Sequence, residues 1–200
     1  MTAGVIVAGG RSIRFGGLEK TVVELDGTPL IKHVADRLGS VTDELVVNCR
    51  ADQRDVIASA LDGTDPRFAI DEIPDRGPTA GIATGLAAVD DEYAVVVACD
   101  MPFLDPDLLA YLLDRVQPHD AAVPKPDEWF EPLHAAYRAE PMAAACERAL
   151  DRGEDRIVAP VFDVDYEIVG REELLANGRL ESFESIDTPD ALALAAERFN

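Results

Sequence analysis

Short runs of apolar, often β-branched residues recur along the first half of the chain, and a stretch with helical spacing follows each of them. Buried strands are predicted at residues 4–8, 44–48, 68–71 and 93–99. Helices are predicted at residues 29–38, 52–61, 79–89 and 106–116. A strand followed by a helix, four times over, predicts an α/β protein with a parallel sheet and right-handed crossovers.

The second half of the chain has a less regular pattern. Strands are predicted there at residues 121–123, 133–137, 166–169 and 184–186. Helices are predicted at residues 141–150 and 189–199, with Asp187 or Thr188 as the cap of the last one. No linker, repeat or low-complexity tract interrupts the pattern, so residues 1–200 are predicted to form a single domain.

Acidic residues dominate the charge of the chain. Asp and Glu number 39 against 18 Lys and Arg, which gives a net charge of -21 dispersed along the sequence. Such a surface repels nucleic acid and anionic membranes, so neither is expected as a partner. Dispersed acid with few lysines resembles proteins of salt-loving organisms, where high ionic strength screens the self-repulsion.

The composition also bears on compartment and on metal or disulfide chemistry. The chain has no run of 18 apolar residues, and its N-terminal apolar stretch is short and lacks a basic flank, so a cytoplasmic protein is expected. Cys49, Cys99 and Cys146 lie far apart and form no CxxC pair, which argues against a zinc site or a disulfide framework. Cys49 and Cys99 each end an apolar run and are expected to be buried free thiols.

A glycine-rich loop follows the first predicted strand. Gly9 and Gly10 are followed by Arg11, Arg14 and Lys20, which concentrate positive charge in an otherwise acidic protein. Glycine lets backbone N–H groups approach an anion, and the cations add attraction, so the loop suits a triphosphate. It is neither GxxxxGK[ST] nor GxGxxG. The alternative is a glycine turn with solvated basic residues.

Carboxylates and an amide follow three of the predicted strands. Asp100 ends the strand at residues 93–99, on the edge where ligands bind in open α/β sheets. A single carboxylate there can hold Mg²⁺ together with substrate phosphates, or it can simply cap the next helix. Asn48 and Asp71 end two further strands, where they can bind a nucleotide or serve as turn residues.

Four segments in order along the chain resemble a known family. Residues 7–20, VAGGRSIRFGGLEK, are similar to the (L/V)AGGxSxRMGxxK signature of nucleotidylyltransferases with the nucleotide-diphospho-sugar transferase type of fold. Residues 77–82 (GPTAGI), 98–104 (ACDMPFL) and 186–192 (IDTPDAL) resemble segments of molybdenum cofactor guanylyltransferases. The resemblance implies a three-layer, Rossmann-like α/β fold with a mostly parallel sheet and helices on both faces.

The same resemblance implies an activity: transfer of GMP from GTP to the phosphate of molybdenum-molybdopterin, with release of pyrophosphate. It implies catalytic roles for Arg14, Lys20 and Asp100, with Mg²⁺ on Asp100. The nucleotide-binding residues it implies are Val7, Ala8, Gly9, Gly10, Lys20, Asn48, Asp71 and Asp100. Candidates for the acceptor side are Gly77, Gly81, His134, Ser185 and Asp187. Because the acceptor phosphate is already anionic, no strong general base is required.

Some departures from the family pattern leave the acceptor open. Ser185 and Asp187 stand where the family usually has Asn. Related small enzymes that use adenosylcobinamide phosphate or phospholactate, or that transfer CMP to molybdopterin, are alternatives. A non-catalytic nucleotide-binding protein is a further one, against which the retention of Arg14, Lys20 and Asp100 argues. The implied partners are GTP, the molybdopterin acceptor and, transiently, other proteins of cofactor biosynthesis or the enzymes that receive the cofactor.

The charge pattern generates a prediction about salt. The Debye length falls from about 10 Å at 0.1 M to about 3 Å at 1 M ionic strength, so repulsion among the carboxylates weakens over that range. We expect the melting temperature, followed by circular dichroism, to rise steeply between these salt concentrations. A melting temperature that stays constant would contradict the interpretation of the acidic composition as an adaptation to salt.

Overall fold

A hydrogen-bonded sheet forms the centre of the computed structural model, which describes residues 2–10 and 20–199. Within these residues the sheet has seven strands in the order β5-β4-β1-β6-β8-β7-β9. They are β1 (Ala3–Val7), β4 (Glu44–Cys49), β5 (Arg67–Ile70), β6 (Tyr93–Ala98), β7 (Ala121–Lys125), β8 (His134–Arg138) and β9 (Tyr166–Gly170). Strand β8 runs antiparallel to β6 and β7, and the other neighbouring pairs are parallel.

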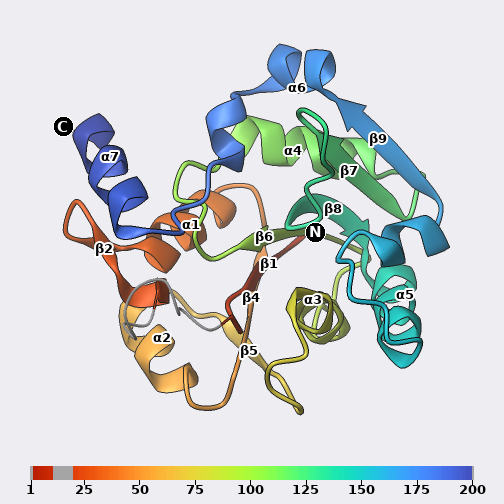
Figure 1. Cartoon of the computed structure of the whole chain (residues 1–200), viewed down its shortest axis with the longest axis horizontal. Helices are drawn as coiled ribbons and strands as arrows, with labels where there is room; N and C mark the ends of the chain where they lie inside the picture. Colours follow the sequence, from red (N-terminus) through yellow and green to blue (C-terminus); the bar gives the residue numbers. More distant parts are fainter. Residues whose placement is uncertain (1, 11–19, 200) are drawn as a thin grey trace.

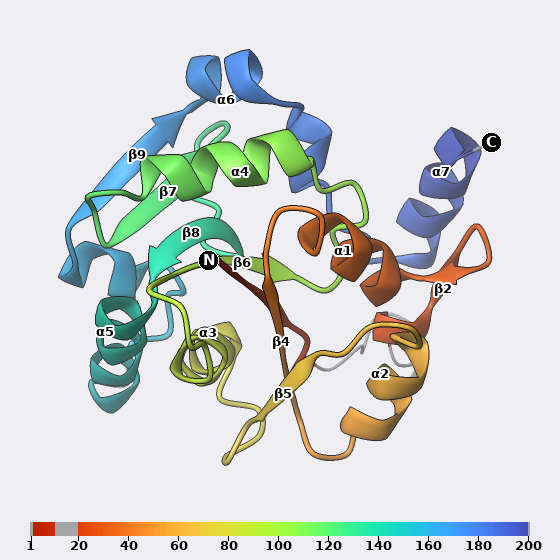
Figure 2. The same cartoon turned by 180° about the vertical axis from the view of Figure 1, so that it is seen from behind.

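Helices cover both faces of this sheet (Figures 1 and 2). One face carries α1 (Leu30–Leu38), α2 (Arg54–Ala60), α4 (Pro106–Arg115) and α6 (Arg171–Asn177), which share one hydrophobic cluster with the strands. The other face carries α3 (Pro78–Ala87) and α5 (Ala139–Asp151), which share a second cluster. The expected α/β architecture, with a mostly parallel sheet and helices on both faces, is confirmed.

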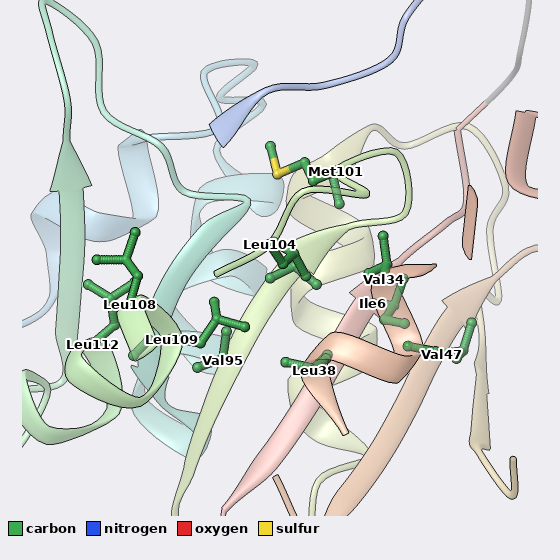
Figure 3. Close-up of a cluster of buried hydrophobic side chains, with 14 of the residues drawn as sticks. Ile6, Val34, Leu38, Val47, Val95, Met101, Leu104, Leu108, Leu109 and Leu112 are labelled. Atoms are coloured by element: carbon green, nitrogen blue, oxygen red, sulfur yellow. The ribbon is translucent and has the colours of Figure 1, made fainter. Parts of the chain in front are cut away.

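The larger of the two clusters fixes α1 and α4 against the centre of the sheet (Figure 3). Ile6, Val47 and Val95 from three adjacent strands meet side chains of both helices and of the loop after β6. The helix and loop residues labelled there are Val34, Leu38, Met101, Leu104, Leu108, Leu109 and Leu112. Ile6, Val47 and Val95 are completely buried, so the strands on which the site is built have little freedom to shift.

The last helix, α7 (Pro189–Phe199), packs against the beginning of the chain. A small third cluster joins Leu25 of the hairpin β2 (Glu24–Leu25) and β3 (Thr28–Pro29) with Leu30 of α1 and Ala195 of α7. The hydroxyl of Thr188 accepts a hydrogen bond from the backbone N–H of Ala191 at 3.1 Å, so Thr188 is the cap of this helix. The chain therefore returns, near its last helix, to the hairpin that follows the glycine-rich loop.

The structure differs from the sequence predictions in the second half. Residues 184–186 do not form a strand; they follow the 3₁₀ turn η4 (Leu180–Phe183), and the N–H of Ile186 donates to the carbonyl of Asp100 at 2.9 Å. This bond runs to a loop and not to a strand, so no ladder forms. Helix α6, the hairpin and the 3₁₀ turns η2 (Lys20–Val22) and η3 (Ala159–Asp163) were not predicted.

Two other expectations concern the cysteines and the membrane. Neither Cys49 nor Cys99 is in a disulfide; Cys49 is buried as predicted, whereas Cys99 is only half-buried. Burial raises the pKa of the Cys49 thiol to about 12, so it stays protonated at neutral pH. No helix in the described part of the chain combines the length and the apolar character needed to cross a membrane.

The close contact between α3 and β1 generates a prediction about stability. A Cβ atom on Gly85 would lie 2.5 Å from Cγ1 of the buried Val5. Alanine normally stabilises a helix interior by about 1 kcal/mol relative to glycine, but overpacking costs roughly 1–3 kcal/mol. We expect Gly85→Ala to lower the free energy of unfolding by about 1 kcal/mol in urea titrations.

Gly170→Ala is the matched control, because its added Cβ would meet no heavy atom of the described residues within 4 Å. We expect it to change the free energy of unfolding by less than about 0.5 kcal/mol. A Gly85→Ala variant that is as stable as the wild-type protein would show that α3 can move away from β1 without cost.

Candidate active site

Four parallel strands end together at one edge of the sheet. The register pairs Val7 at the end of β1 with Asn48 of β4 on one side and with Ala98 of β6 on the other. The chain builds β4 and β5 on one side of β1 and then crosses to place β6 on the other side. A crevice outside the carboxyl ends of the strands is expected at such a reversal, and ligands bind there in open α/β sheets.

A cavity of about 710 Å³ opens at this edge. Its lining includes most of the residues that the sequence nominated: Val7, Ala8, Gly9, Gly10, Lys20, Asn48, Asp71, Gly77, Gly81, Asp100 and Asp187. It also includes Asp75 and Arg76, which the sequence analysis did not single out. Arg76 could have been predicted from the sequence, because it directly precedes the GPTAGI segment; it adds a cation to the cavity wall.

One wall of the cavity is a polar pair from β4 and the end of β5. The amide nitrogen of Asn48 donates to Asp71 Oδ1 at 2.7 Å and to the carbonyl of Ala69 at 3.2 Å. Asn48 Oδ1 is buried and has no hydrogen-bond partner among the described residues. A buried acceptor without a partner is costly, so this oxygen is suited to a donor that a ligand brings.

Two glycines make room for the Asn48–Asp71 pair. A Cβ on Gly81 would lie 2.6 Å from Asn48 Oδ1, and a Cβ on Gly9 would lie 2.7 Å from Asp71 Oδ2. At both distances a side chain on the glycine would push the Asn48 amide or the Asp71 carboxylate out of its present position. Gly81, predicted from the sequence for the acceptor side, therefore lies against the Asn48–Asp71 pair.

A cluster of one cation and two carboxylates forms the opposite wall. The ammonium group of Lys20 binds Asp100, at the end of β6, and Asp187, which precedes α7. The backbone bond from Ile186 to Asp100 holds the two carboxylate segments together. Burial acts to lower the pKa of Lys20, but the attraction and hydrogen bonds of both carboxylates outweigh it, so the pKa is raised. Lys20 is thus a fixed positive charge at neutral pH.

Asp100 has the properties expected of a ligand for Mg²⁺. Its Oδ1 is buried and has no hydrogen-bond partner among the described residues, while Oδ2 binds Lys20. Burial raises the pKa of the Asp100 carboxyl, and Lys20 offsets part of this effect. The described residues contain no group of three or more His, Cys, Asp and Glu suited to a metal ion. Mg²⁺ is usually bound by one or two carboxylates, water and substrate phosphates, so a site built on Asp100 fits this ion.

Two of the nominated residues that the structure describes, His134 and Ser185, are not part of the cavity lining. His134 is completely buried: its Nε2 lies 3.3 Å from Ser182 Oγ, and its ring packs on Phe183. Burial lowers the pKa of His134 to about 3, so it is a neutral core residue and the expected acceptor contact is wrong. Ser185 is exposed and donates to Asp187 Oδ2 at 3.1 Å. Arg14 lies outside the described residues.

Residues 4–166 match the family described as the MobA-like NTP transferase domain. The chain belongs to this family. Its nominated catalytic and nucleotide-binding residues all fall within the matched range, whereas Ser185 and Asp187 lie beyond it.

Several MobA-like proteins resemble the chain over nearly its whole length. It is 57% identical to a probable molybdenum cofactor guanylyltransferase of the halophilic archaeon Natronomonas pharaonis, over 98% of both chains. It is 37% identical to one of Haloferax mediterranei, over 98% of this chain and 93% of the relative. The relative in Natronomonas agrees with the interpretation of the acidic composition.

A crystal structure of molybdopterin-guanine dinucleotide biosynthesis protein A from Archaeoglobus fulgidus has the same fold. It is 32% identical, with a TM-score of 0.81 over 100% of this chain and 98% of that chain. The similarity covers the strands, the glycine-rich segment and α7, so the parts of the chain that line the cavity belong to the shared architecture.

The Lys20–Asp100 pair of this MobA-like protein generates a prediction about stability. Lys20 and Asp100 are only 13% and 14% exposed, so removing the cation leaves a nearly buried carboxylate without its partner. We expect Lys20→Met to lower the free energy of unfolding by about 3 kcal/mol without added Mg²⁺. The loss should be smaller in an Asp100→Asn background, because no buried negative charge is then left behind.

Lys32→Met serves as the control for this double-mutant cycle. Lys32 pairs with Asp36, whose side chain is 55% exposed, and such a surface pair contributes at most about 1 kcal/mol. The measurement is urea unfolding of the four proteins of the cycle. Additive effects of Lys20→Met and Asp100→Asn would contradict the coupling that the ion pair implies.

Proposed function

We propose that the chain transfers GMP from GTP to the terminal phosphate of molybdenum-molybdopterin and releases pyrophosphate. The observation that carries the proposal is the composition of one cavity. It brings the glycine-rich segment, Lys20 and Asp100 together with the Asn48–Asp71 pair at the carboxyl ends of the parallel strands. The names of relatives that match the whole chain point to the same activity.

The phosphates of GTP are assigned to the glycine-rich segment and Lys20. The N–H groups of Gly9 and Gly10 provide donors, and Lys20 provides a positive charge that its raised pKa keeps at neutral pH. Arg14, outside the described residues, is assigned to the leaving pyrophosphate. These groups stabilise the negative charge that builds on the pyrophosphate as it departs.

Asp100 is the residue proposed to hold Mg²⁺, with Asp187 as the neighbouring carboxylate. When bound with the nucleotide, the ion neutralises phosphate charge and makes the α-phosphorus easier to attack. Lys20 occupies Oδ2 of Asp100, while Oδ1 has no partner among the described residues. One carboxylate can therefore serve the ammonium group and a cation through its two oxygens.

The transfer itself needs no strong base. An oxygen of the acceptor phosphate is already anionic, forms the bond to the α-phosphorus of GTP, and the bond from that phosphorus to pyrophosphate breaks. Among the described residues that line the cavity there is no histidine, and His134 is neutral in the core. The protein's contribution is to position both phosphates and to compensate their charge.

The Asn48–Asp71 pair is assigned to the nucleoside. A carboxylate can accept from N1–H and the exocyclic amine of guanine or from the ribose hydroxyls, and Asn48 Oδ1 can accept a further donor. We assign Gly77, Ser185 and Asp187 to the acceptor side. Gly77 and Asp187 line the cavity, and Ser185 holds Asp187 through its hydroxyl.

The proposal also covers the organisation of the protein and its surroundings. Residues 1–200 act as one catalytic domain, because α7 packs on the hairpin next to Lys20 and brings Asp187 to the cavity. We place the reaction in the cytoplasm, where GTP is available. Transient contacts with other proteins of cofactor biosynthesis, or with enzymes that receive the product, complete the proposal.

A nucleotide and acceptor panel tests the function. Purified protein with Mg²⁺ is given GTP, CTP or ATP together with molybdopterin, and pyrophosphate release is measured. Adenosylcobinamide phosphate and phospholactate serve as alternative acceptors. Release only with GTP and molybdopterin supports the proposal. Release with CTP or with another acceptor contradicts it, and binding of GTP without any release indicates a non-catalytic nucleotide-binding protein.

Asp100→Asn is the critical variant for this function. It keeps the shape of the side chain and removes the charge, so we expect turnover to fall at least about 100-fold while the fold is retained. Asp107→Asn, at an exposed position in the first turn of α4, is the matched control and should keep wild-type activity. Wild-type activity of Asp100→Asn at limiting Mg²⁺ would contradict the assignment of Asp100.

A further inference from the structure

Two buried side chains hold the carbonyl groups of the glycine-rich segment. Arg50, directly after β4, donates from Nη1 to the carbonyl of Gly9 at 2.8 Å and to that of Gly10 at 3.1 Å. Gln53, at the start of α2, donates from Nε2 to the carbonyl of Ala8 at 3.2 Å and to that of Gly10 at 3.4 Å. Three consecutive carbonyl groups are thus bound from the same side.

Arg50 and Gln53 also hold each other in place. The backbone N–H of Arg50 donates to Gln53 Oε1 at 3.0 Å, and the Arg50 side chain is further fixed by Asp52 at 3.0 Å. Arg50 is 9% exposed and Gln53 is 1% exposed. An arginine and a glutamine this deeply buried lose rotamer freedom, which costs free energy. Their hydrogen bonds to the carbonyl groups of Ala8, Gly9 and Gly10 offset part of that cost.

The bound carbonyls determine where the N–H groups point. In a trans peptide the C=O and N–H bonds lie on opposite sides of the peptide plane. The carbonyl of Ala8 shares its peptide with the N–H of Gly9, and the carbonyl of Gly9 shares its peptide with the N–H of Gly10. Glycine peptides rotate more freely than others, so without an external partner their orientation is weakly determined.

We propose that Arg50 and Gln53 are positioning residues that turn the N–H groups of Gly9 and Gly10 toward the phosphates of the nucleotide. The inference rests on the proposed function, because it takes the triphosphate as the ligand of this segment. The same contacts keep the carbonyl oxygens, which repel phosphate, turned away from the cavity. Arg50 acts through the backbone of the loop, and its charge is shared with Asp52.

The chemistry of the two side chains decides which replacements test these contacts. The guanidinium of Arg50 is a planar fork, whereas lysine offers a single ammonium group on a flexible stem. Gln53 supplies a donor to the loop and an acceptor to Arg50, and Gln53→Glu would place a carboxylate against two carbonyl oxygens. Arg50→Lys and Gln53→Glu therefore disturb the carbonyl contacts with little change in size.

The experiment measures binding of three probes by calorimetry in the presence of Mg²⁺: GTP, pyrophosphate and guanosine. We expect Arg50→Lys and Gln53→Glu each to raise the Kd of GTP and of pyrophosphate by about 10-fold, through loss of charge-assisted donors to phosphate. The Kd of guanosine should change less than about 2-fold, because the nucleoside is assigned to the Asn48–Asp71 pair. If Arg50 and Gln53 had a purely structural role, the variants would bind all three probes more weakly.

Arg54→Lys is the matched control for Arg50→Lys. Arg54 begins α2, four positions further along the chain, and binds the exposed Asp55 and the ring of Phe68 instead of the loop. We expect it to bind all three probes as the wild-type protein does. The proposal is overturned when Arg50→Lys binds GTP and pyrophosphate like the wild-type protein. It is also overturned when the Kd of guanosine rises by the same factor as the Kd of GTP.

Two further results separate this inference from the proposed function. A preference for CTP would contradict guanylyl transfer. It would still support the inference if Arg50→Lys weakened the binding of CTP and of pyrophosphate to the same extent. If the variants do not fold, the test uses the wild-type protein, whose amide proton signals of Gly9 and Gly10 are followed by NMR. Both signals should move downfield when pyrophosphate is added, and signals that stay in place overturn the proposal.

Discussion

The common register of β1 with its two neighbours is the constraint on which the rest of the structure depends. Because these strands are parallel, their last residues lie side by side, and whatever follows each strand begins at the same edge. Gly9 and Gly10, Asn48 and Asp100 therefore lie at one cavity, although 38 to 91 positions of sequence separate them. The apolar clusters on both faces keep this register in place, and even small shifts would collide with close-packed side chains.

The first half of the fold could be predicted because its strands are buried on both faces and read as continuous apolar runs. The strand predicted at residues 184–186 failed because a short apolar segment carries no information about its partner, and here the N–H of Ile186 meets a loop carbonyl. Helix α6 was missed because only Leu174 of its seven residues is buried, which leaves too weak a stripe to detect.

The candidate site likewise has residues that the sequence could place and residues that it could not. Residues that come just after strands, such as Asp71 and Asp100, could be placed at the cavity because strand ends have a known place in a parallel sheet. His134 was misjudged because sequence does not show which face of β8 a polar side chain occupies. Arg50 and Gln53 carry no local signal, since their partners are backbone carbonyls some forty positions earlier, and only the folded chain reveals that contact.

The bridge from Lys20 to Asp187 has a consequence for protein synthesis. It joins positions 167 apart, whereas β1, β4, β5 and β6 with the residues at their ends all lie within the first hundred. On the ribosome, Asp187 follows Asp100 by roughly 4 to 17 seconds at ordinary rates of elongation. During that interval the emerging chain contains the strands β1, β4, β5 and β6 but not the carboxylate that completes the cluster. With the site roles proposed above, a nascent chain can thus meet GTP before it is able to act on it.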